Sequence, residues 1–118
     1  MDHRLIIVEG CPGSGKSSTS QFLCRQLQRA GHACRWYYEE EMPHPVAATK
    51  GIGRVRDFRE YGRAALRRWR DFVSRARRSD EIAIIESHFF QDVITPLLRV
   101  DVKPQRIRKV VHGMAKVC

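Results

Sequence analysis

Eight consecutive residues near the start of this 118-residue chain form its clearest chemical pattern. The segment Gly10-Cys-Pro-Gly-Ser-Gly-Lys-Ser17 matches G-x-x-x-x-G-K-[ST] in full and lies between an apolar run and a helical pattern. Its glycines let the backbone wrap closely and direct successive N–H groups at phosphate oxygens, reinforced by the positive end of the following helix. The pattern therefore predicts a loop that binds the phosphates of ATP or GTP together with Mg²⁺.

Two side chains of this segment have distinct expected roles. The Lys16 ammonium is a compact cation for the β- and γ-phosphates, and the Ser17 hydroxyl is a ligand for Mg²⁺. Substitution of Lys16 is expected to remove phosphoryl transfer before it removes the fold. The residues expected to contact the nucleotide are Gly10, Cys11, Pro12, Gly13, Ser14, Gly15, Lys16, Ser17 and Ser18.

A single acid follows the apolar run Ile82-Ala-Ile-Ile85. Glu86 stands where an acid can order Mg²⁺ and its waters, so Ser17 and Glu86 are the predicted metal ligands. A solvated acid at a strand end is the alternative interpretation, because apolar runs often end in an acid.

Three further acids, Glu39, Glu40 and Glu41, follow a second strand pattern. One of them could accept a proton from the hydroxyl that receives phosphate, and we name Glu40 as the candidate. A plain acidic loop explains the run equally well, and the sequence does not say which acid points inward. The predicted catalytic residues are Lys16, Glu40 and Glu86.

Alternating strand and helix patterns position these residues. Short β-branched apolar runs predict strands, whereas apolar residues at three- and four-residue steps predict helices. Their alternation predicts an α/β fold with parallel strands and right-handed crossovers, and ligands of such sheets bind at the carboxyl ends of the strands. In chain order the expected elements are strand Arg4–Glu9, helix Lys16–Ala30, strand Ala33–Tyr38, a loop at 42–53, a long helix between Val55 and Ala76, strand Ile82–Ile85, helix Phe89–Arg99 and a last helix from Pro104.

Length and composition favour a single domain over residues 1–118. No apolar run approaches the roughly 20 residues that span a bilayer, so no membrane segment is expected. The N-terminal run lacks the cleavage site of a secretory signal, which predicts a cytoplasmic protein. The four cysteines form no C-x-x-C pair, so neither a redox motif nor a metal cluster is indicated.

The net charge of +9 comes largely from ten arginines between Arg54 and Arg78. Guanidinium groups bind phosphate well, which would suit an anionic substrate, but a solvated helix face is the simpler interpretation for most of them. His88, two residues after Glu86, could face the site, but a place at the surface is the simpler expectation. The aromatic residues expected in the core, rather than in a base-stacking platform, are Trp36, Tyr37, Tyr38, Phe58 and Trp69.

The chain resembles the P-loop nucleoside and nucleotide kinase superfamily, including its thymidylate-kinase-like members. The matching segments are Ile6-Ile-Val-Glu-Gly-Cys-Pro-Gly-Ser-Gly-Lys-Ser-Ser-Thr19, Trp36-Tyr-Tyr-Glu-Glu40 and Ile84-Ile-Glu-Ser-His-Phe-Phe90. The resemblance implies a P-loop NTPase three-layer sandwich, with helices on both faces of a parallel sheet of order 2-3-1-4-5. Strands 2-3-1 of that order fall within this chain. It also implies ATP at the loop and a small-molecule acceptor between strand two and the helices before strand three.

Two departures from the family pattern change what the resemblance implies. Ser87 stands where the family has an arginine, and the chain ends at Cys118, before the family's lid and its fourth and fifth strands. We therefore expect a small-molecule kinase, or its ATP-binding remnant, with slow or no phosphoryl transfer. Strand one, left as a sheet edge, favours self-association.

A basic nucleic-acid-associated NTPase or binding module is the alternative function, motivated by the charge. We regard nucleic acid as the less favoured partner, because no recognition motif accompanies the charge and the acidic run lies at the ligand-binding edge of the sheet.

Overall fold

The computed structural model describes residues 4–41, 43–46 and 58–118. Most of the expected loop at 42–53 and the expected first residues of the long helix, with Arg54 and Arg56, lie outside the described residues. The elements are β1 Leu5–Val8, α1 Lys16–Arg29, β2 Cys34–Tyr37, α2 Phe58–Arg78, β3 Ile82–Glu86, the π-helix η2 His88–Ile94, α3 Thr95–Arg99 and α4 Pro104–Ala115.

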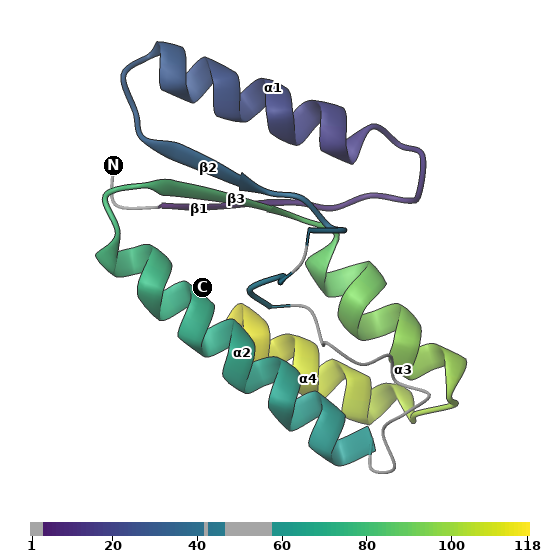
Figure 1. The fold of residues 1–118 in the computed structure, drawn as a ribbon. Coiled ribbons are helices and arrows are strands. Elements are labelled where there is room, and N and C mark those ends of the chain that lie inside the picture. The colour runs from purple at the N-terminus through teal and green to yellow at the C-terminus, as the bar shows by residue number, and fades with distance from the viewer. Residues whose placement is uncertain (1–3, 42, 47–57) are drawn as a thin grey trace.

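Three parallel strands form the sheet, in the order β1-β3-β2. Ile84 of the central strand is in register with Ile6 on one side and with Trp36 on the other. Helix α1 covers one face of the sheet, and α2 and α4 lie on the other (Figure 1). The expected α/β class, the parallel strands and the strand order are therefore confirmed.

The central strand is apolar on both sides because it separates two hydrophobic clusters. All five residues of β3 are buried. Ile82 and Ile84 pack with Cys24 of α1, whereas Ala83 and Ile85 pack with the cluster that α2 and α4 share. Successive strand residues point to opposite faces, so this continuous apolar run is what a sheet covered on both faces requires.

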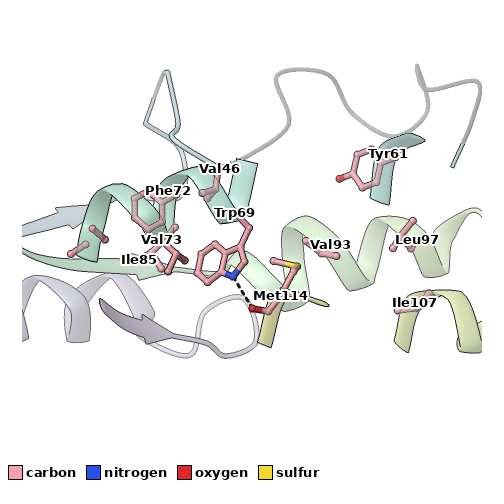
Figure 2. Packing of buried hydrophobic residues seen from close by; sticks show 12 residues of the cluster. Val46, Tyr61, Trp69, Phe72, Val73, Ile85, Val93, Leu97, Ile107 and Met114 are labelled. Carbon is pink, nitrogen blue, oxygen red and sulfur yellow. Dashed lines mark hydrogen bonds between the residues drawn. The ribbon is translucent and has the colours of Figure 1, made fainter. Parts of the chain in front are cut away.

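Helix α2 supplies the centre of the larger cluster through Trp69, which is fully buried. The Trp69 indole N–H donates a hydrogen bond of 3.0 Å to the main-chain oxygen of Met114 and so joins α2 to α4 (Figure 2). The two helices also approach closely at Gly62, where a Cβ atom would lie 2.9 Å from Val110 Cγ2. The arginines of α2 lie mostly on its exposed face, as expected.

The segment after β3 differs from the expected helix Phe89–Arg99. Ser87 adopts a left-handed φ of 62°, and the chain then forms the π-helix η2 before the short helix α3. Pro96 has no N–H to donate to the Asp92 carbonyl, as an α-helix would require, and that carbonyl accepts the Tyr61 hydroxyl instead at 2.7 Å. The break in α-helical pairing is thus compensated from α2.

Among the described residues no helix combines the length and apolarity needed to cross a membrane.

Candidate functional site

The glycine-rich loop, Gly10–Ser17, connects the carboxyl end of β1 to the start of α1. Gly13 and Gly15 have φ values of 77° and 91°, a left-handed conformation that strains any residue with a side chain. The Ser14 N–H donates to the Cys11 carbonyl at 3.1 Å and closes the turn. Residues 11 to 15 are exposed. The loop therefore presents its backbone, rather than packed side chains, at the surface.

The first turn of α1 leaves N–H groups for a ligand. Helix α1 begins at Lys16, and its N-cap, Gly15, makes no side-chain cap hydrogen bond. The first N–H groups of a helix have no intrahelical acceptor, and the helix dipole makes that end positive. The first turn contains no acidic residue. This end of α1 is therefore suited to an anion.

Lys16 curves back over its own loop. The residue is 7% exposed, and its ammonium donates a hydrogen bond of 3.1 Å to the Cys11 carbonyl. The cation is thereby held beside the loop backbone, on the segment where the phosphates of a nucleotide are expected.

Ser17 and Glu86 meet although 69 positions separate them in the sequence. The Ser17 hydroxyl donates to Glu86 Oε1 at 2.9 Å. The same oxygen accepts the Glu39 main-chain N–H at 3.2 Å, and Oε2 accepts the Trp36 indole N–H at 3.2 Å. Glu86 is fully buried, so its interpretation as a solvated strand-end acid is wrong. A carboxylate only accepts hydrogen bonds, which matches these three donors.

The three consecutive acids after β2 lie in different surroundings. Glu39 reaches Glu86 only through its main chain, and Glu41 pairs with Arg35 at 3.5 Å. Glu40 is exposed and accepts the Tyr38 hydroxyl at 3.2 Å, which raises the pKa of Tyr38. Within the described part of the chain, none of these three carboxylates bonds to Lys16 or Ser17. The catalytic role of Glu40 stays a prediction.

A buried polar cluster, which includes His88, adjoins Glu86. His88 is 1% exposed and stacks on Trp69 with ring centroids 4.9 Å apart, so its expected place at the surface is wrong. Its Nδ1 lies 3.5 Å from the Asp92 carboxylate. The left-handed turn at Ser87 directs the chain into η2 and places His88 beneath α2. The sequence signal for His88 was its place two residues after Glu86, which ends a buried strand.

Glu9 belongs to the same edge of the sheet. Its Oε1 accepts the Phe89 main-chain N–H at 2.6 Å, which joins the start of the glycine-rich loop to the start of η2. Burial raises the pKa of Glu9, an effect partly offset by the Phe89 and Phe90 main-chain hydrogen bonds. The carboxyl ends of β1 and β3 thus bring Glu9, Glu86 and His88 to one edge.

The described residues contain no group of three His, Cys, Asp or Glu side chains placed to hold a metal ion. Magnesium bound to a nucleotide needs fewer protein ligands, because phosphate oxygens and waters fill most of its six positions. The Ser17 hydroxyl and Glu86 carboxylate, 2.9 Å apart beside the glycine-rich loop, fit that requirement. One would bind the ion directly, and the other would hold a coordinated water.

Comparisons of the chain with protein-family models, with curated proteins and with solved structures found no match. The glycine-rich loop and the buried Glu86 are therefore the features of this chain that indicate a function.

Proposed function

We propose that this protein binds a Mg²⁺-nucleoside triphosphate, ATP or GTP, at the glycine-rich loop and is a small-molecule kinase of the P-loop class. The contact between Ser17 and the buried Glu86 is the observation that carries the proposal. This contact joins Ser17, the last residue of the motif, to an acid that is distant in the sequence. Glu86 ends β3 at the same edge of the sheet where the loop lies. A glycine turn with no ligand would not require such an acid.

Each residue of the candidate site has its own role in the proposed binding of the nucleotide. The loop N–H groups and the first turn of α1 bind phosphate oxygens, Lys16 neutralises the outer phosphates, and Ser17 with Glu86 positions the metal. The nucleotide, when bound, would supply the phosphoryl group that is transferred. The protein contributes position and charge, which account for most of the catalysis in this class of reaction.

The acceptor is proposed to lie at the carboxyl ends of β2 and β3. Ligands of parallel α/β sheets bind at this edge, and Glu9, Glu40 and His88 are among the side chains there with proton-accepting groups. Glu40 is exposed beside this edge, so an acceptor hydroxyl could approach it without rearrangement of the core. A nucleoside, a nucleotide or another hydroxylated small molecule is the expected class of acceptor.

Lys16→Ala tests the proposal directly. Removal of the ammonium should weaken Mg²⁺-ATP binding at least about tenfold, because a hydrogen bond to a charged group contributes on the order of 1.5–3 kcal/mol. The circular dichroism spectrum should not change. Lys116→Ala is the matched control, since Lys116 is an exposed lysine at the end of α4. Isothermal titration calorimetry measures both affinities, and equal affinities in the two variants would contradict the proposal.

Transfer needs a separate measurement. The protein is incubated with γ-labelled ATP and a panel of nucleosides, nucleotides and hydroxylated small molecules, with Lys16→Ala as the blank. Label in an acceptor above that blank supports a kinase. Its absence from every acceptor would restrict the function to nucleotide binding.

A further inference from the structure

A basic hollow of about 740 Å³ lies between the first half of α2, the turn after α3 and the first half of α4. Its volume is within the range of small-molecule sites in proteins, roughly 300–1,000 Å³. No residue of the glycine-rich loop lines this hollow. We call it the α2–α4 hollow.

Five cations line the α2–α4 hollow, and Asp101 is its one acidic lining residue. The five cations lie on α2, on α4 and at the residue that precedes α4. Arg59 and Arg63 lie one turn apart on α2, so they share a face. The cations at the start of α4 are Lys103, Arg106 and Lys109.

Four of these cations are not neutralised within the described part of the chain. The ion pairs there join Arg4 to Asp80, Arg35 to Glu41 and His88 to Asp92, and none includes a residue of the hollow. The four are Arg63, Lys103, Arg106 and Lys109. Like charges around a concave surface repel one another, and a bound anion would remove that repulsion.

The apolar lining of the hollow is aliphatic. It includes Leu66 of α2, Leu97 of α3, Val102 before α4 and Val110 of α4, and Leu97 is almost fully buried. No aromatic side chain is among its lining residues in the described structure. Stacking on aromatic rings is the usual means of holding the bases of single-stranded nucleic acid, so this surface is poorly suited to that class of ligand.

We propose that the α2–α4 hollow binds a soluble amphipathic anion, an aliphatic molecule that carries phosphate or carboxylate groups. The aliphatic part lies on Leu66, Val102 and Val110, and the acidic groups reach the cations of the two helices. Arginine binds such groups through two parallel hydrogen bonds, whereas lysine adds point charge. The concave shape favours a single molecule over the flat surface of a membrane.

Three probes separate the two parts of this recognition. Calorimetric titrations use octyl phosphate, which has both parts, inorganic phosphate, which lacks the chain, and octyl glucoside, which lacks the charge. Octyl phosphate should bind at least about tenfold more tightly than either of the others, because it gains both the apolar burial and the charge-assisted hydrogen bonds. Inorganic phosphate that binds as tightly as octyl phosphate would overturn the proposal.

Substitutions locate the site. The double variant Arg63→Gln with Arg106→Gln should weaken octyl phosphate binding about tenfold or more and leave Mg²⁺-ATP affinity unchanged. Arg70→Gln is the control, because Arg70 is exposed on α2 outside the hollow. Thermal unfolding confirms that each variant folds. A loss in Arg70→Gln equal to that in the double variant would show a general charge effect and overturn the proposal.

The same chemistry occurs in membranes as the headgroup and chain of an acidic lipid. Vesicles of phosphatidylcholine with phosphatidic acid test that source in a sedimentation assay. The soluble-ligand proposal expects octyl phosphate binding and no sedimentation with these vesicles at about 0.15 M salt. Sedimentation with the vesicles and no binding of octyl phosphate would overturn it.

Discussion

Glu86 organises the candidate site at the scale of single residues. Its two oxygens accept hydrogen bonds from the Ser17 hydroxyl, the Trp36 indole and the Glu39 main chain. These donors come from α1, from β2 and from the segment after β2, so one buried carboxylate joins three parts of the chain. A carboxylate held in this way needs little rearrangement to position a cation, which is how preorganised sites act.

Glu86→Gln should reduce the Mg²⁺ dependence of ATP binding, because the amide lacks the charge that orders the metal. It should also lower the free energy of unfolding by about 1–3 kcal/mol, since the amide NH₂ cannot accept the hydrogen bonds that one carboxylate oxygen accepts. Titrations with ATP, with and without Mg²⁺, measure the first effect, and denaturant unfolding measures the second.

Glu81→Gln is the matched control at the other end of β3, where the side chain is only half-buried. It should retain the Mg²⁺ dependence of the unmodified protein. The same loss of Mg²⁺ dependence in both variants would place Glu86 outside the metal site.

The sequence could indicate those candidate-site residues that belong to a motif of fixed spacing or that end a strand pattern. The glycine-rich loop follows a pattern with fixed spacing, and Glu86 ends an apolar run, so both were predicted in place. His88 was not, because its burial depends on a left-handed turn at Ser87 that no local pattern encodes. Glu40 lies beyond β2, which ends at Tyr37, so the alternation of strand residues could not predict the direction of its side chain.

At the scale of the elements, α2 and α4 form one packed unit beneath the sheet. Trp69 contacts Phe72 and His88 through stacked rings and bonds to the carbonyl of Met114. The same indole therefore holds α4 in place and covers the buried histidine next to Glu86. The stability of this unit supports the geometry of the candidate site.

Trp69→Phe should lower the free energy of unfolding by about 1–3 kcal/mol, because it leaves a cavity and removes a buried hydrogen bond. Phe22→Ser is the control on α1, since Phe22 is 61% exposed and surface substitutions usually change stability by less than about 0.5 kcal/mol. Denaturant unfolding followed by circular dichroism compares the two. Equal effects would contradict the role of Trp69 as the centre of the core.

The order of helices and strands was predictable because the two differ clearly in the spacing of their apolar residues. Helix α2 continues to Arg78, two residues beyond the predicted end at Ala76, where the apolar pattern stops before the helix does. The π-helix was not predictable from the local pattern, which also fits an α-helix, and the Tyr61 hydroxyl that bonds to its Asp92 carbonyl is distant in the sequence. Phe22 of α1 is exposed, and this helix packs on the sheet through Leu23 and Leu27.

At the scale of the whole molecule, charge and apolar surface are separated. Most arginines of α2 are exposed and five cations line the α2–α4 hollow, whereas the sheet lies between two helical layers, as the ribbon in Figure 1 shows. The net charge of +9 makes copies of the chain repel one another. Salt screens this repulsion, so at physiological salt it is weak beyond about 8 Å. Association between copies would therefore use the sheet and strengthen as salt increases.

The outer edge of β1 is the place where such association is expected. In the described structure β1 is hydrogen-bonded to β3 alone, and its four residues are only half-buried. The Arg4 and Val8 carbonyls accept main-chain N–H groups from β3 and from the residue that follows it. Residues 4, 6 and 8 therefore direct their N–H and C=O groups toward β3. Leu5 and Ile7 therefore present their N–H and C=O groups to the open edge, which can pair with another strand.

We expect a second copy of the chain to pair with this edge, and amide hydrogen exchange provides the test. The Leu5 and Ile7 amides should exchange more slowly as the protein concentration rises, because pairing protects them. Those of Ile6 and Val8, which face β3, should keep the same exchange rate and act as internal controls. Sedimentation should show a dimer fraction that grows with concentration and with salt, the opposite of the salt dependence of nucleic-acid binding. A monomer at every concentration, with unchanged exchange at Leu5 and Ile7, would contradict self-association through β1.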